Sequence, residues 1–372
     1  MYKRQDEIKN NDGVDAILEV GFPGGYGFYG VADILSGEAN PSGHLTDTYA
    51  VTNANSPAAQ NFGNYEWTNA DPSVNINAEE VEAEGIYTGY KYYETRYADT
   101  VLGQGNADAT VGSSTGKAWN YDDEVSYPFG YGLSYTTFEQ TLKSVDVDLA
   151  NRTVTAEVDV KNTGDVAGKD VVQLYTSVPY TDYDVENKVE KSAVQLLDYE
   201  KTDMIEPGES QTVTITADAQ DMASWDSTCS NEAGTTGNWI LDNGTYYFTV
   251  GNGAHEALNN ILAKKTGSTD NLIAINEDEN ITADNAIVWN LGEKNQETYS
   301  VGVENALQDA DINNFIENTV EYTTRSDWSK GWTPVEAITP TEEMMVGLTN
   351  NTYSLTENSD YNEVWGADNG LQ

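Results

Sequence analysis

The chain reads YPFGYGLSYT over residues 127–136, and this short stretch separates two different sequence patterns. Aromatic residues alternate with glycines in it, so rings can pack into a junction between domains while the glycines let the backbone turn. Before it lie an apolar run, a glycine-rich turn and a helical pattern, whereas the residues after it alternate between apolar and polar. We therefore expect a domain boundary close to residue 136, with a different fold on each side.

The N-terminal side predicts one step of an α/β fold. Residues 14–20, VDAILEV, form an apolar run that stops at GFPGG, residues 21–25, a pattern typical of a buried strand ended by a tight turn. Residues 30–35, GVADIL, predict a short helix, and strand, turn and helix in succession are typical of an α/β domain. After a turn signal at 40–43, the polar stretch to about residue 83 predicts irregular surface chain.

The C-terminal side predicts an all-β sandwich. Residues 154–160 alternate between small apolar and polar side chains, and residues 170–176 and 210–216 are strand-like. Pro207 and Gly208 mark a turn between two of these runs. Several short strands at this spacing are typical of a β-sandwich.

A hairpin is expected to close this sandwich. Residues 238–250 contain Asn243 and Gly244, a pair that favours a type I′ turn. That turn would place Ile240 and Tyr246 on facing strands.

A helix is predicted after the hairpin, at residues 253–264. Its apolar face consists of Ala254, Leu258, Ile261 and Leu262. The sequence then becomes polar and weakly patterned, and residues 309–316 and 342–348 predict short helices in an extension that wraps another domain.

The charge of the chain excludes several classes of partner. It has 62 acidic and 18 basic residues, a formal net charge of -44, and such a surface repels nucleic acid phosphates and anionic lipid head groups. We therefore expect no nucleic acid partner. A neutral substrate such as a sugar is compatible with this field, although strong acidity is more often a solubility trait.

Cysteine and histidine are too scarce for two common kinds of site. Cys229 is the only cysteine, so no internal disulfide can form, and His44 and His255 are the only histidines. We therefore expect neither a disulfide nor a zinc site with His/Cys spacing. No run approaches the roughly 20 apolar residues that span a bilayer, so we expect no membrane-spanning segment in this chain.

Residues 25–30, GYGFYG, match the glycine pattern of dinucleotide-binding turns. Such a site also needs a second strand that ends in an acidic residue about 20 positions further on, whereas Asp47 follows the turn-rich stretch NPSGHLT. We interpret these glycines as positions that allow a helix to pack closely on a strand, and we expect no cofactor.

A family resemblance emerges when the motifs are taken in order. Four stretches resemble the C-terminal half of the α/β sandwich of β-glucosidase-like enzymes in glycoside hydrolase family 3: GFPGG at 21–25, ADILSGEANPSGHL at 32–45, EGIYTGYKYY at 84–93 and YPFGYGLSYT at 127–136. Four later stretches look like the fibronectin type III-like domain of these enzymes: VKNTG at 160–164, VVQLY at 171–175, LDYEK at 197–201 and PGES at 207–210. The resemblance covers about residues 14–250.

The resemblance implies that the catalytic residues lie outside this chain. Retaining glycosidases need a nucleophile and an acid/base whose carboxyl groups lie about 5–5.5 Å apart. The family's nucleophilic aspartate would lie on a barrel domain, and its acid/base glutamate upstream of residue 14. We therefore assign no catalytic residue and no substrate-binding residue, and we expect Asp15, Glu19, Asp33 and Glu38 to be solvated.

Four tyrosines leave two interpretations open. Tyr87, Tyr90, Tyr92 and Tyr93 carry rings that can stack on sugars. Packing at a domain boundary is the commoner use of such a cluster, and we favour it.

The tail looks like a permuted subgroup of the family, in which the barrel follows the fibronectin-like domain. The stretches that carry this similarity include TDT at 46–48, TRSDW at 324–328 and GADNGL at 366–371. Both ends of the chain are expected to be cut. Residues 1–5 back-translate to the end of a transposon-based sequencing adapter, which suggests an assembly artefact.

The sequence thus predicts a multi-domain chain. We expect the C-terminal part of an α/β sandwich at 1–136, a fibronectin type III-like, immunoglobulin-like β-sandwich at 137–252, and an irregular extension at 253–372 towards a missing barrel. The parent enzyme would be bacterial and would hydrolyse β-linked gluco-oligosaccharides in its barrel without a cofactor, and this chain alone would be inactive.

Two other functions remain open. The chief alternative is a non-catalytic carbohydrate-binding or cell-surface module, and a nicotinamide-dependent oxidoreductase is a distant third. Sugar and linkage preference, export and oligomeric state are not specified by the sequence.

Overall fold

A computed structural model describes residues 11–61, 65–66, 78–79, 81–230, 234, 236–276, 279–293, 313 and 319–332. The chain forms two compact units. The first consists of Met1–Asn61, Glu82–Asn305 and Glu321–Thr333, and the second of Phe62–Val81, Ala306–Val320 and Pro334–Gln372. In the second unit, β2 (Tyr65–Glu66) pairs antiparallel with β3 (Ala78–Glu79). All that follows concerns the first unit.

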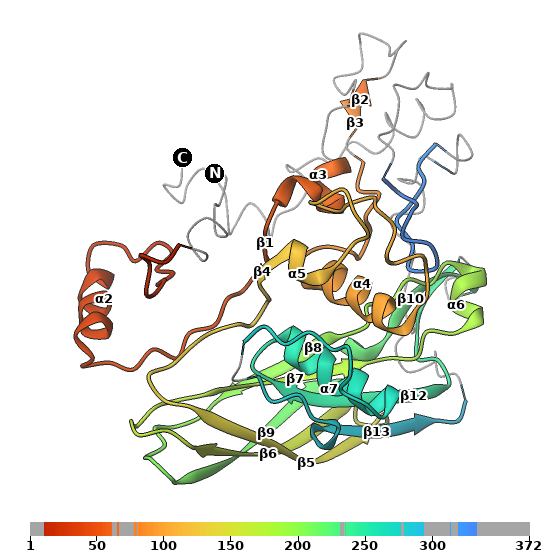
Figure 1. Cartoon of the computed structure of the whole chain (residues 1–372). Helices are drawn as coiled ribbons and strands as arrows, with labels where there is room; N and C mark the ends of the chain where they lie inside the picture. The colour runs from red at the N-terminus through yellow and green to blue at the C-terminus, as the bar shows by residue number, and fades with distance from the viewer. Residues whose placement is uncertain are drawn as a thin grey trace, which may run out of the picture. The chain divides into compact units, whose positions relative to one another are not determined.

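Two antiparallel sheets form the sandwich (Figure 1). One has the order β5-β6-β9, with β5 at Phe138–Asp148, β6 at Thr153–Asn162 and β9 at Ser210–Asp218. The other has the order β13-β12-β7-β8, with β13 at Ala286–Leu291, β12 at Gly244–Gly251, β7 at Val171–Ser177 and β8 at Gln195–Lys201. The predicted strands at 154–160, 170–176 and 210–216 are thus confirmed.

The core between the sheets follows from the period of two along each strand. On β6, the side chains of Val154, Ala156, Val158 and Val160 are fully buried, and they pack against Leu174 of the other sheet in one apolar cluster. Alternate side chains of β6 are less buried. The predicted alternation therefore identifies the inner face of the sheet.

The predicted hairpin at 238–250 is wrong. Strand β11 (Thr236–Ile240) pairs with β10 (Ser224–Ser230), with Trp225 opposite Trp239, whereas β12 pairs with β7 and β13. The chain bends at Asn243 between β11 and β12, but Asn243 is not among the residues with positive φ, so the type I′ turn does not form. A turn signal is local, however, and pairing follows long-range burial, which draws β12 into the middle of the four-stranded sheet.

The outer face of the four-stranded sheet is covered by helices. They are α4 (Tyr90–Leu102), α5 (Tyr121–Glu124) and α7 (Ala254–Thr266), which share a second apolar cluster with Tyr175 of β7. The predicted apolar face of α7, at Ala254, Leu258, Ile261 and Leu262, is fully buried and is confirmed. Beyond α7 the chain returns to the sandwich, because β13 pairs along β12. The division at residue 252 stays a prediction.

The predicted strand at 14–20 is wrong. These residues form no strand, and Ile17, for example, keeps 50% of its surface exposed. A strand is stable only where a neighbouring chain accepts and donates its backbone hydrogen bonds, and no described segment pairs with this run. The helix predicted at 30–35 is confirmed as α2 (Gly27–Ser36), which ends at Gly37 in the left-handed conformation.

The remaining elements are short. They are β1 (Tyr49–Ala50), which pairs with β4 (Val125–Tyr127), η1 (Asn53–Asn55), α3 (Pro57–Asn61), α6 (Asp182–Asn187), η2 (Ala219–Met222) and η3 (Ala283–Asn285). The helices predicted at 309–316 and 342–348 lie outside the described residues, apart from Asn313. Within the described parts of the chain, no helix has the length and apolar character to cross a membrane.

Candidate functional site

A groove of about 480 Å³ opens between the segment that follows residue 127, the start of β7, the N-terminus of α7 and the residues Ile275, Asn276 and Glu279. Its lining is mainly polar and includes His44, Tyr131, Asp170, His255, Glu256 and Glu279. The titratable side chains come from segments far apart in sequence. Folding therefore assembles the groove, and no local motif contains it.

The aromatic–glycine motif builds the floor of the groove. Gly130 N donates to Leu45 O at 2.8 Å, and Leu45 N donates to Tyr131 O at 2.8 Å. Ala254 N donates to Phe129 O at 2.9 Å, so the same segment caps the start of α7. A Cβ atom on Gly130 would clash with Gln173 and lie 2.8 Å from Gly253 Cα. The glycine therefore permits the close approach of backbones that the motif predicts.

Two carboxyl groups of the groove hold their protons more tightly than usual. Burial, followed by the charge of Glu279, raises the pKa of Glu256 to about 7. Asn252 Nδ2 donates to Glu256 Oε2 at 3.0 Å. Burial also raises the pKa of Asp170, although Gln140 Nε2 donates to its Oδ2 at 2.8 Å. Near neutral pH Glu256 can therefore both donate and accept hydrogen bonds, as a ligand rich in hydroxyl groups requires.

A buried network lies behind the groove. His255 Nδ1 lies 2.8 Å from Glu94 Oε2, and its Nε2 lies 2.7 Å from the backbone oxygen of Ile273. The Tyr121 hydroxyl donates to Glu94 Oε1 at 2.5 Å, and its ring stacks on His255 at 4.1 Å. Burial alone would lower the pKa of His255, but the charge and hydrogen bond of Glu94 outweigh it, so this pKa is raised.

A second polar cluster anchors residues 321–332 to α4. Asp99 is fully buried and accepts two hydrogen bonds from Arg325 Nε, at 2.9 and 3.0 Å, and one from Arg325 Nη2 at 2.8 Å. Trp328 Nε1 donates to the same carboxylate at 2.8 Å. A Cβ atom on Gly105 would clash with the backbone oxygen of Arg325. The segment therefore has one well-defined seat on α4.

A buried lysine lies next to this anchor. Lys191 Nζ lies 2.8 Å from Asp184 Oδ1 and also pairs with Asp242. Arg325 Nη1 donates to the backbone oxygen of Lys191 at 3.4 Å. Two acidic groups around one ammonium ion satisfy its charge, so this arrangement is a structural ion cluster.

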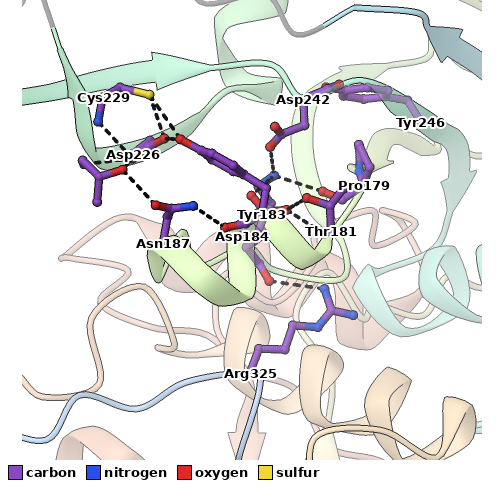
Figure 2. Close-up of polar contacts among 12 residues, drawn as sticks. Pro179, Thr181, Tyr183, Asp184, Asn187, Asp226, Cys229, Asp242, Tyr246 and Arg325 are labelled. Carbon is purple, nitrogen blue, oxygen red and sulfur yellow. Dashed lines mark hydrogen bonds and ion pairs between the residues drawn. The ribbon is translucent and has the colours of Figure 1, made fainter.

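The only cysteine lies beside this cluster (Figure 2). Cys229 Sγ donates to Asp226 Oδ2 at 2.8 Å, and the Tyr183 hydroxyl donates to the same oxygen at 2.5 Å. Burial raises the pKa of Asp226, but these hydrogen bonds, with those from Thr228, outweigh it and lower the pKa. Asp226 thus organises the part of β10 in which the pairing register with β11 shifts, between Asp226 and Ser230.

Three of the four tyrosines considered for stacking on a sugar are inaccessible to a ligand. Tyr87, Tyr92 and Tyr93 are buried, and Tyr90 stacks on Phe129 at 4.6 Å. These rings pack the junction, as the favoured interpretation states. The acidic residues expected to be solvated, Asp15, Glu19, Asp33 and Glu38, are all exposed.

Sequence reasoning missed the groove itself. Asp170, Glu256 and Glu279 carry no local signal among 62 acidic residues. His255 was named only as one of the two histidines in the argument against a zinc site. Within the described residues, no group of three or more His, Cys, Asp or Glu side chains is placed to hold a metal ion.

Comparison with known proteins gives two domain matches. Residues 2–135 match the family model of the glycosyl hydrolase family 3 C-terminal domain, and residues 170–254 match that of the fibronectin type III-like domain. β-Glucosidase A of Butyrivibrio fibrisolvens is 35% identical over 259 residues, which cover 66% of this chain and 26% of that protein. A β-glucosidase of Ruminococcus albus is 35% identical over 246 residues, which cover 65% of this chain and 21% of that protein.

Solved structures of β-glucosidases also match part of this chain. A β-glucosidase from Paenibacillus barengoltzii matches with 32% identity and a TM-score of 0.45, over 61% of this chain and 20% of that one. The chain thus spans about a quarter of the length of the curated relatives it matches. By its two matched domains, in this order, the chain is similar to the C-terminal part of β-glucosidase-like enzymes of glycoside hydrolase family 3.

Proposed function

We propose that this chain supplies accessory domains to a retaining β-glucosidase-like hydrolase and is inactive alone. The observation that carries this proposal is the order of the two matched domains, residues 2–135 and 170–254. The aromatic–glycine motif joins them and caps α7. The named relatives are β-glucosidases, and the match covers 26% or less of each. The remainder of such an enzyme has room for the catalytic carboxyl pair.

The substrate class follows from this proposal. A parent enzyme of this kind would cleave β-linked gluco-oligosaccharides in two steps, with one carboxylate as nucleophile and one carboxylic acid as acid/base. We propose that both lie outside this chain, and that the barrel follows the fibronectin-like domain. The domain limits at 136 and 252 are part of the same proposal.

A direct assay tests the proposed inactivity. The purified chain should release no p-nitrophenol from an aryl β-glucoside above the buffer rate, while the Ruminococcus albus β-glucosidase serves as the positive control. Glu256 is the groove carboxyl whose pKa is raised to about 7, a value that suits an acid/base. Turnover that disappears in Glu256→Gln would contradict the proposal and make the groove catalytic.

A carbohydrate-binding module is the second candidate. The groove favours it, because Tyr131 and Phe138 line it together with hydroxyl, amide and carboxyl groups, a combination that suits a neutral sugar. Pull-down on insoluble glucans distinguishes the two. An accessory part without its barrel should stay in the supernatant, whereas retention that Tyr131→Ala abolishes would favour a binding module.

A further inference from the structure

The two contacts of the His255 ring require more than one proton on its ring nitrogens and their partners. The backbone oxygen of Ile273 can only accept a hydrogen bond, so Nε2 of His255, 2.7 Å away, carries a proton and donates it. Nδ1 lies 2.8 Å from Glu94 Oε2. This second contact needs a proton of its own, held either by the ring or by the carboxyl group. Without it, a nitrogen lone pair faces a carboxylate oxygen.

We propose that Glu94 and His255 form a proton lock, which fastens the groove wall formed by residues 273–276 and Glu279 to α4 and α7 and releases it when the shared proton is lost. The lock is buried on both sides, since the side chain of Glu94 is 0% and that of His255 1% exposed. No solvent can therefore separate the two acceptors after deprotonation, and the ring has to move.

The ring holds the wall through a small set of hydrogen bonds. Ile273 O accepts from His255 Nε2 and, at 2.8 Å, from Asn259 Nδ2. Ile273 N donates to the Tyr97 hydroxyl at 2.8 Å, and that hydroxyl donates to Asn259 Oδ1 at 2.9 Å. Glu279, at the far end of the wall, accepts from Asn259 Nδ2 at 2.9 Å. Movement of the His255 ring thus removes one of the two hydrogen bonds that Ile273 O accepts at the start of this wall.

The surroundings of the ring set the direction of the pH dependence. Glu94 and Tyr97 face it from α4, Tyr121 from α5 and Glu279 from the wall, and Glu256 follows it on α7. The charges of Glu94 and Glu279 favour the protonated ring, while burial opposes it. The net result is a pKa raised above the ordinary 6.5.

The sign for stability follows from that shift. A folded-state pKa above the unfolded value gives stabilisation that is complete below pH 6.5 and is lost as the pH rises through the folded pKa. The carboxyl of Glu256, with its raised pKa of about 7, contributes with the same sign. The test therefore has to isolate His255.

Nuclear magnetic resonance can isolate it, because the chain has only two histidines. The ring signal lost in His255→Gln and kept in His44→Gln belongs to His255. In the wild type its titration midpoint should lie above 6.5, and in Glu94→Gln it should fall, since the carboxylate that shares the proton is gone. A wild-type midpoint at or below 6.5, or one that Glu94→Gln leaves unchanged, would overturn the lock.

Hydrogen exchange keeps the test independent of variants that fail to fold. In the wild type between about pH 6 and pH 9, the amides of residues 268–276 should exchange faster than base catalysis alone predicts, while those of residues 154–160 in β6 should not. Equal pH dependence in both peptides would refute release of the wall.

Discussion

At the residue scale, the most demanding contact is the one between Asp99 and Arg325. Their side chains are 0% and 4% exposed, and Gln104 Nε2 adds a further hydrogen bond to Asp99 at 2.6 Å. Removing both charges from water costs about as much as the pair regains. The contact therefore specifies where residues 321–332 dock more than it adds net stability.

Loss of one partner should be costly. Arg325→Met leaves the Asp99 carboxylate buried without its cation, and we expect the free energy of unfolding to fall by about 3–5 kcal/mol. Arg152→Met is the matched control, because its pair with Asp218 is 42% and 52% exposed and should contribute at most about 1 kcal/mol. Urea denaturation followed by Trp fluorescence measures both. Equal losses in the two variants would mean that burial of the Asp99 pair is unimportant.

At the element scale, two glycines with nearly identical φ angles test the close packing of the aromatic–glycine motif against the start of α7. Gly130 has φ 81° and Gly208 has φ 80°, but a Cβ atom on Gly208 meets nothing within 4 Å. Gly208→Ala should cost roughly 1–2 kcal/mol from its left-handed backbone alone. Gly130→Ala should cost about 1–3 kcal/mol more, because the added Cβ atom would push the motif away from Gln173 and Gly253. Thermal unfolding of the two variants measures the difference in stability. Equal losses would show that the contact between the motif and α7 tolerates a methyl group.

Elements with strong local patterns could be predicted from sequence, and elements defined by partners could not. The alternation of Val154 to Val160 and the apolar face of α7 record burial directly in the residue order. The run at 14–20 is also rich in apolar residues. No described strand pairs with it, however, so this segment lacks the neighbour that a strand requires. For β11 and β12, Asn243 and Gly244 indicated where the chain changes direction but not the choice of neighbouring strands.

The groove could not be predicted from the sequence for a related reason. A carboxyl group becomes unusual through its surroundings, and Asp170, Glu256 and Glu279 meet only after the sandwich and α7 have packed. Their one-letter codes do not differ from those of the other acidic residues. The aromatic–glycine motif alone pointed to this place, as a junction and not as a groove.

At the scale of the whole molecule, the net charge of -44 opposes compaction. We expect the free energy of unfolding to rise with sodium chloride between about 0.01 and 0.15 M, as the Debye length shortens from roughly 30 to 8 Å. Urea is the suitable denaturant because it carries no charge. Sucrose at matched osmolality provides the control, and a chain no more stable in salt than in dilute buffer would show that self-repulsion is negligible.

The seat of residues 321–332 on α4 also determines how the molecule would carry a mechanical load. Tension applied to the chain beyond Trp332 would meet Trp328 and Arg325 first, and it would pass through Asp99 into the buried helix. Strand β13, which precedes the segment in sequence, would be shielded from peeling. A load attached beyond Trp332 would thus act on α4 in the interior of the unit, and it would not separate the edge strand β13 from β12.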